Sequence, residues 1–116
     1  MKNELLEPLE SILNAADALV EDAYTSLNAQ QSQCIYAVRQ VAEHLQQWVA
    51  SMPELNSTSA RMVLDFETRS HLASIIGYAE ILLDQDEGPL TEQQQQLVHQ
   101  IRTSGKLVLH RLTKEA

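Results

Sequence analysis

The chain has 116 residues, with 8 Lys and Arg against 16 Asp and Glu, which gives a formal charge of −8. This length fits one compact domain, and no run approaches the ~18 apolar residues that a membrane span needs. The acidic balance disfavours nucleic acid and anionic membranes as partners, because both attract cationic surfaces. The single cysteine, Cys34, excludes an internal disulfide and a multi-cysteine zinc site.

Composition also indicates the fold class. Only 3 Gly and 3 Pro interrupt a chain rich in Leu, Ala, Gln and Glu, and 44% of its residues are apolar. So few turn formers in a globular composition favour a small number of long helices. The start of the chain, Met1 to Glu4, lacks the apolar core of a secretory signal peptide, so we expect a cytoplasmic protein.

The first two helices are predicted from apolar spacing. Apolar residues recur every three or four positions between Leu5 and Val20, which aligns them on one helical face. The pattern fades at residues 24–26. Asn28, followed by Gln31 three positions later, is typical of a helix start, and a second apolar face runs from there to Met52.

The second half repeats this organisation. Pro53 and the polar residues 56–59 break the pattern, and any of those four polar residues could cap the next helix. A third apolar face extends to Leu83 and ends at the breaker sequence 86–89. Thr91 with Gln94 predicts the start of a fourth helix. Since no segment alternates with a period of two, we expect no strands.

The sequence contains an internal repeat. Shifted by 63 residues without a gap, positions 9 to 49 meet ten identical residues. The residues of the first copy are Leu9, Ser11, Ile12, Ala16, Leu19, Leu27, Gln30, Gln31, Gln33 and Arg39. Polar and loop positions match as well as apolar ones, so chance similarity between amphipathic helices is a poor explanation.

The repeat predicts an all-α fold of two tandem helical hairpins. One hairpin exposes an apolar stripe, and two hairpins can bury their stripes in an antiparallel four-helix bundle. We expect a single domain over residues 1–116, with repeats over about 3–52 and 60–114 and a linker over about 53–59. A complete bundle within the chain predicts a monomer; pairing of hairpins between chains, and hence a dimer, is the alternative.

Several motifs of the second half carry a family resemblance. They are the segments 72–83 (LASIIGYAEILL), 88–93 (GPLTEQ) and 101–105 (IRTSG). They resemble the dimerisation and histidine-phosphotransfer domain of sensor histidine kinases, and the first half resembles a more diverged copy. In that family, hairpins from two subunits form the bundle. A histidine on the first helix takes a phosphoryl group from ATP and passes it to an aspartate of a response-regulator receiver domain.

The reactive histidine of that family is missing. Alignment without gaps puts Phe66 and Asn3 at the two phosphoacceptor positions, and neither side chain can act as the nucleophile. Glu67 and Arg69 of the motif remain, and His71 replaces its proline. The chain holds neither the ATP-binding domain that the resemblance implies nor a Gly-rich phosphate loop. We therefore expect no enzyme activity, no cofactor and no metal site, since no histidines are paired for a metal.

Our leading hypothesis is a non-catalytic interaction module that mimics the kinase bundle and binds or sequesters a receiver domain or a partner kinase. The resemblance implies a docking surface at these residues: Phe66, Glu67, Arg69, Ser70, Ala73, Gly77 and Arg102. One alternative is a histidine phosphotransfer protein that uses a displaced histidine, His71. Another is a purely structural assembly module with no two-component partner.

Other residues are expected to serve packing. Cys34 lies on the apolar seam and is predicted to be buried and unreactive. Gly77 and Gly105 lie inside helices, where they favour close helix approach or a local bend. His44 is expected to be half-buried. Trp48 is interpreted as a plug at the end of the bundle, with an interface anchor as the alternative.

Overall fold

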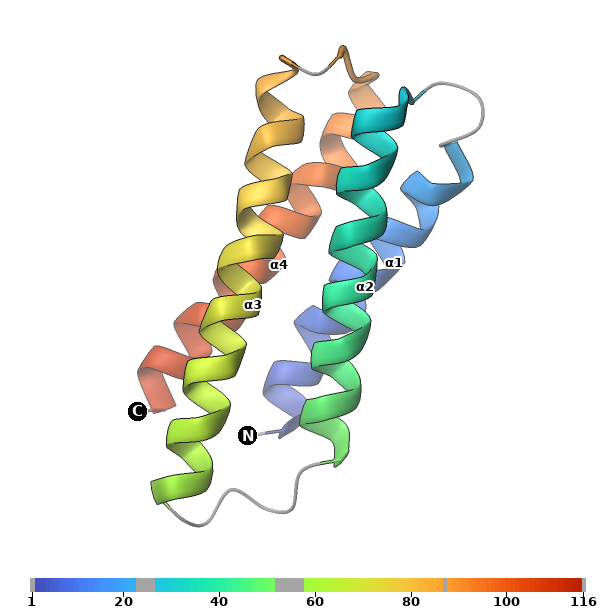
Figure 1. Ribbon diagram of the computed structural model, residues 1–116. Helices are drawn as coiled ribbons and strands as arrows, with labels where there is room; N and C mark the ends of the chain where they lie inside the picture. The colour runs from blue at the N-terminus through green and yellow to red at the C-terminus, as the bar shows by residue number, and fades with distance from the viewer. Residues whose placement is uncertain (1, 23–26, 52–57, 87, 116) are drawn as a thin grey trace.

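A computed structural model describes residues 2–22, 27–51, 58–86 and 88–115 (Figure 1). It contains four helices, α1 (Lys2–Asp22), α2 (Ala29–Ser51), α3 (Thr58–Asp84) and α4 (Glu92–Glu115), and no strand among the described residues. The predicted all-α class is confirmed. The expected linker over 53–59 lies outside the described residues except for its last two residues, which already belong to α3.

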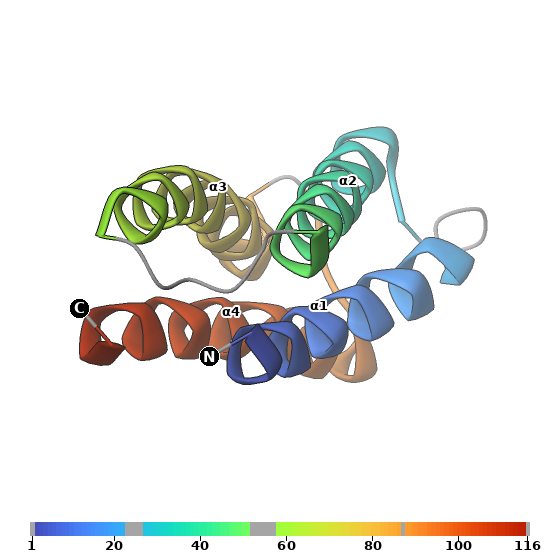
Figure 2. The ribbon, with the colours of Figure 1, turned by 90° about the horizontal axis from the view of Figure 1, so that it is seen from below.

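The four helices form an antiparallel bundle, as predicted. Each helix packs against its two neighbours in the ring α1–α2–α3–α4, while no Cα atoms of the diagonal helices come within 8 Å of each other. The molecule measures 46 × 21 × 18 Å, and both ends of the chain lie at the same end of the bundle (Figure 1). Viewed from that end, the helices follow one another counter-clockwise (Figure 2). α1 and α3, the first helices of the two hairpins, therefore lie diagonally opposite.

The two hairpins bury matching positions. Each of twelve buried residues in the first hairpin has a buried residue 63 positions later. The first set is Leu5, Leu9, Ile12, Ala16, Leu19, Leu27, Gln31, Ile35, Val38, Ala42, Leu45 and Val49. Since these positions recur every three or four residues, one stripe of each helix faces a shared core.

The two predicted helix starts are confirmed as reciprocal capping boxes. The backbone N–H of Gln31 donates to Asn28 Oδ1 at 2.8 Å, and the N–H of Asn28 donates to Gln31 Oε1 at 3.0 Å. Thr91 and Gln94 repeat the arrangement at 3.1 and 2.9 Å. Both glutamines are only 2% exposed. Each box satisfies backbone donors that the first turn of a helix leaves unpaired.

The loops of the two hairpins meet at one end of the bundle. Gln31 Nε2 donates to the carbonyl of Pro89 at 3.2 Å, across 58 residues of sequence. Gly88 has a φ of 149°, and a Cβ there would lie 2.5 Å from Asn28 Nδ2. Only glycine adopts this backbone conformation without strain, and its missing side chain leaves room for Asn28. The breaker sequence thus ends α3 and also docks one hairpin on the other.

Polar contacts join α1 to α4. Gln100 Nε2 donates to the carbonyl and the hydroxyl of Ser11, each at 3.1 Å, and the hydroxyls of Ser104 and Ser11 are 3.1 Å apart. Arg111 donates to the carbonyl of Glu4. This carbonyl would normally accept from the residue four positions later, but Pro8 has no N–H. The arginine from α4 therefore partners a carbonyl that α1 itself leaves unpaired.

Candidate docking faces

Five of the seven residues that the resemblance implies for docking share the outward side of α3. Phe66, Arg69, Ser70, Ala73 and Gly77 recur at spacings of three and four, away from the buried stripe of that helix. We call these five residues the α3 face. Its aromatic member, Phe66, is 73% exposed, which is far more than a core aromatic would be. The rest of the face is made of small side chains and one half-buried arginine.

Arg102 and Glu67 flank the α3 face on its two sides. Arg102 reaches from α4 to α3, where its Nε lies 3.5 Å from Glu80 Oε2. Arg39 and Asp17, the residues 63 positions earlier, form the same pair at 2.7 Å between α2 and α1. Arg102 therefore links the two helices of its own hairpin at the edge of the face. Exposed Glu67 lies on the other side of α3, toward α2.

Gly77 does not have the packing role that its position suggested. A Cβ at Gly77 would meet nothing within 4 Å, so the predicted close approach of a neighbouring helix is wrong at this residue. At Gly105 the prediction holds, because a Cβ there would lie 3.1 Å from Ile76 Cγ1. Gly77 lies on the outward side of α3, whereas Gly105 is buried. The open space over Gly77 extends the uncrowded part of the α3 face.

His71 faces α2, not the α3 face. Its ring meets that of His44 edge to face, with centroids 5.3 Å apart, and its Nε2 lies 3.9 Å from Glu67 Oε2. The side chain of His71 is 32% exposed. The expected half-buried His44 is wrong, since His44 is exposed. His71 is thus a side chain of the α2–α3 seam.

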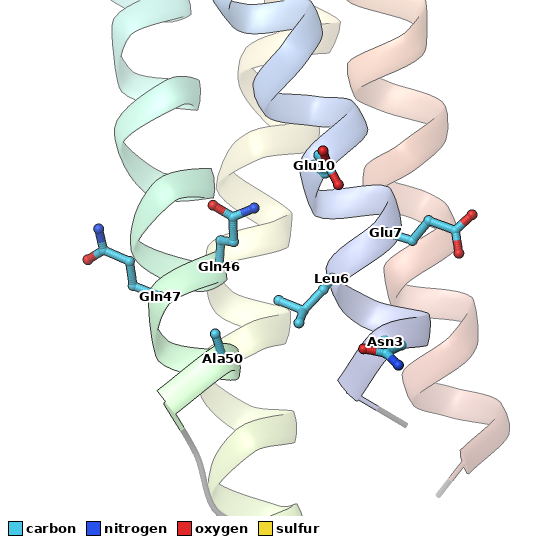
Figure 3. Close-up of a pocket in the computed structure, with 7 residues that line it drawn as sticks. All are labelled: Asn3, Leu6, Glu7, Glu10, Gln46, Gln47 and Ala50. Atoms are coloured by element: carbon cyan, nitrogen blue, oxygen red, sulfur yellow. The ribbon is translucent and has the colours of Figure 1, made fainter.

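A groove opens on the opposite hairpin, between α1 and α2 (Figure 3). It encloses about 520 Å³ and is lined by Asn3, Leu6, Glu7, Glu10, Gln46, Gln47 and Ala50. In Figure 3, Leu6 points from α1 toward α2. Four of these lining residues are the counterparts, 63 positions earlier, of the first four residues of the α3 face. With Asn14, the counterpart of Gly77, we call them the α1 face: Asn3, Leu6, Glu7, Glu10 and Asn14.

The second predicted phosphoacceptor position, Asn3, is therefore an exposed residue at this groove. Sequence reasoning did not identify the groove. The repeat alignment could have indicated it, because it maps every residue of the α3 face onto α1.

A smaller hollow of about 300 Å³ lies between α2 and α3, lined by Gln30, Gln33, Cys34, Tyr78 and Ile81. Cys34 is half-buried, so the prediction of a buried thiol is wrong. On α3 the hollow is lined by Tyr78 and Ile81, where the first repeat has Ala15 and Ala18. Trp48 is half-buried and packs against the core near the end of α2, as expected for a bundle-end residue.

Two kinds of feature are absent from the described residues. In that part of the chain, no three His, Cys, Asp or Glu side chains are grouped to hold a metal ion. None of the helices over the same residues combines the length and apolarity that crossing a bilayer requires.

Comparison with protein-family models, with curated proteins and with solved structures finds no match for this chain. The resemblance to the histidine-kinase bundle therefore stays a prediction from the motifs of the second half.

Proposed function

We propose that this chain is a non-catalytic interaction module of two-component signalling that binds a receiver domain on the α3 face. The observation that carries the proposal is Phe66. An aromatic side chain that is 73% exposed stands at the position that the resemblance assigns to the phosphoacceptor, on the same side of α3 as the small residues Ser70, Ala73 and Gly77. Exposed aromatic anchors beside small residues are typical of protein interfaces, where one large side chain contributes much of the binding energy.

The arrangement of the bundle supports this proposal. In the family that the motifs resemble, two subunits each contribute one hairpin to a four-helix bundle. Here both hairpins belong to one chain, and they bury matching positions around one core. By analogy with the bundle that the resemblance implies, a single-chain bundle of this kind supports docking of a receiver domain. Phenylalanine in place of histidine leaves binding as the function of the face, since phenylalanine carries no nucleophile.

The test is a titration of the full chain with the receiver domains of its host, by isothermal titration calorimetry. We expect one or more receivers to bind, and Phe66→Ala to weaken binding by about tenfold or more, as loss of an interface anchor does. Tyr36→Ala is the matched control, because Tyr36 is an exposed aromatic (41%) on the other hairpin. Unchanged binding by the Phe66→Ala variant would show that Phe66 is not part of the interface. Association with a host kinase alone would replace the receiver as partner, and no association with either would contradict the proposal.

A second candidate, phosphotransfer through His71, is favoured by one observation. The carboxylate of Glu67 lies 3.9 Å from His71 Nε2, where it can assist proton exchange at a partly exposed imidazole. Incubation with a phosphorylated receiver distinguishes the candidates. Acid-labile phosphate on the chain, lost in His71→Ala but kept in His99→Ala, would favour transfer. A chain that stays unlabelled while binding the receiver would support the non-catalytic module.

A further inference from the structure

We infer that the chain has one receiver-docking face, the α3 face, and that Glu7 and Glu10 prevent docking on the equivalent α1 face. This inference rests on the proposed function and assigns the stoichiometry and the specificity-determining residues of that binding. A bundle of two identical subunits presents two identical faces. In this chain the equivalent faces lie on diagonal helices, and they differ in chemistry.

The two faces differ first in their outward side chains. On the α1 face, the position of exposed Phe66 is taken by Asn3, so the apolar anchor is missing. The positions of Ser70 and Ala73 are taken by Glu7 and Glu10, both exposed. A helix that packs against small residues on α3 would meet two long, charged side chains on α1. The groove on this side is therefore rimmed by carboxylates.

The two faces also differ in charge. Segment 3–14 of α1 carries three glutamates and no basic residue, whereas segment 66–77 of α3 carries one residue of each sign. Among the residues of the faces themselves, the α1 face holds two carboxylates, Glu7 and Glu10, and the α3 face holds one guanidinium, Arg69. The formal charge is thus −2 on the α1 face and +1 on the α3 face.

A receiver domain brings an aspartate to the phosphoacceptor position of a kinase bundle. Like charges that face each other across an interface disfavour association, and complementary charges speed it and select the partner. The α3 face, with Arg69 and no acidic residue of its own, is therefore better matched to an acidic site than the α1 face is. The first hairpin repels it with Glu7 and Glu10. The chain imitates the shape of a symmetric dimer but offers a receiver only one complementary side.

Calorimetry with a receiver domain that binds the full chain tests the stoichiometry. We expect one receiver per chain, with an affinity that falls as salt rises. The double variant Ser70→Glu/Ala73→Glu copies the carboxylates of the α1 face onto the α3 face and should weaken binding by about tenfold or more. Glu21→Ala/Asp84→Ala is the control, since it removes two exposed charges outside both faces. The changes in these two double variants are at exposed positions, and circular dichroism verifies the fold.

The reverse variant tests the role of the glutamates directly. Asn3→Phe/Leu6→Arg/Glu7→Ser/Glu10→Ala copies the α3 face onto α1 and should raise the stoichiometry from one receiver per chain to two. Two receivers on the unmodified chain, or one receiver that Ser70→Glu/Ala73→Glu does not displace, would overturn this inference while leaving the proposed function intact. A stoichiometry of one in the reverse variant would overturn the role of Glu7 and Glu10. No binding of any receiver would overturn the proposed function and this inference together.

Discussion

The two hairpins have corresponding residues in their core and caps, and different residues on their outer faces. Their capping boxes, interhelical ion pairs and twelve core positions correspond at a constant offset of 63 residues. Their outer faces share almost nothing, with Glu7 and Glu10 opposite Ser70 and Ala73 in the alignment. A core position accepts few side chains, because interiors are close-packed, whereas an outward position is limited only by what it binds. The comparison therefore separates residues needed for the bundle from residues available for a function.

A few buried positions break the agreement. Leu5 corresponds to Thr68, whose hydroxyl is buried without a hydrogen-bond partner among the described residues. Ala42 corresponds to Gly105, which allows Ile76 to approach. These exchanges lower side-chain volume or add polarity in the second hairpin only. They are the places where the two hairpins should contribute differently to stability.

The largest effect on stability is expected at the two capping boxes, which both hairpins share. Gln31→Ala and Gln94→Ala each remove a buried side chain that caps a helix, so we expect each to lower the free energy of unfolding by about 1–3 kcal/mol. The neighbouring glutamines provide matched controls, since Gln30 and Gln93 are exposed and their alanine variants should change little. Urea denaturation followed by circular dichroism measures all four variants. A loss at only one of the two boxes would show that the repeats are not equivalent in stability.

Thr68→Val tests the clearest mismatch in the core. The two side chains have nearly the same shape, and the variant removes a buried hydroxyl that has no hydrogen-bond partner among the described residues. We expect the free energy of unfolding to rise by about 1 kcal/mol, because an unsatisfied buried polar group is costly. Thr103→Val is the control at an exposed threonine of α4. Destabilisation by Thr68→Val would mean that the hydroxyl has a polar partner, and so that the second hairpin uses this position.

Apolar periodicity and capping residues predicted the elements because these signals are local. The starts at Asn28 and Thr91 could be predicted because each box spans only four residues. The repeat extended the prediction to the bundle, because two hairpins of the same pattern can bury the same stripes. The resemblance supplied the residues of the α3 face, and their spacing of three and four then sets the side of the helix on which they lie.

Features that depend on which helices become neighbours could not be predicted. Cys34 shares the apolar pattern of α2 but lines a hollow between α2 and α3. His44 is exposed, and its ring meets His71 of the next helix. Periodicity gives the face of one helix and does not give the distance to its neighbours. Gly77 was misread for the same reason, because a glycine within a helix has the same sequence signature in open space as at a close approach.

The Gly77→Ala variant tests whether the space next to Gly77 is open. With nothing within 4 Å of the added Cβ, only the higher helix propensity of alanine remains, and we expect about 1 kcal/mol of added stability. Gly105→Ala should gain less, since its Cβ would press on Ile76 at 3.1 Å. Thermal or urea denaturation compares the two variants. Equal gains would show that Ile76 moves aside freely, and the two glycines would then be equivalent.

The smallest effect is expected at the ion pairs that both hairpins share. The hydrogen bond that Arg39 donates to Asp17, and then the charge of that carboxylate, raise the pKa of Arg39. A raised pKa adds stability that is fully present below the ordinary pKa of arginine and is lost only as the pH rises through the higher value. It therefore gives no pH dependence near neutrality.

The side chains of Arg39 and Asp17 are 45% and 57% exposed, and those of Arg102 and Glu80 are 34% and 53% exposed. Ion pairs that are this open to solvent contribute little to stability, so Arg39→Gln and Arg102→Gln should leave the unfolding midpoint unchanged within experimental scatter at both low and high salt. A clear fall of the unfolding midpoint in Arg102→Gln alone would show that this ion pair stabilises the second hairpin and not the first. Arg102 lies at the edge of the α3 face, and Arg39 lies at the edge of the α1 face. If the unfolding midpoints are unchanged but Arg102→Gln alone weakens receiver binding, this arginine serves the α3 face and not the bundle.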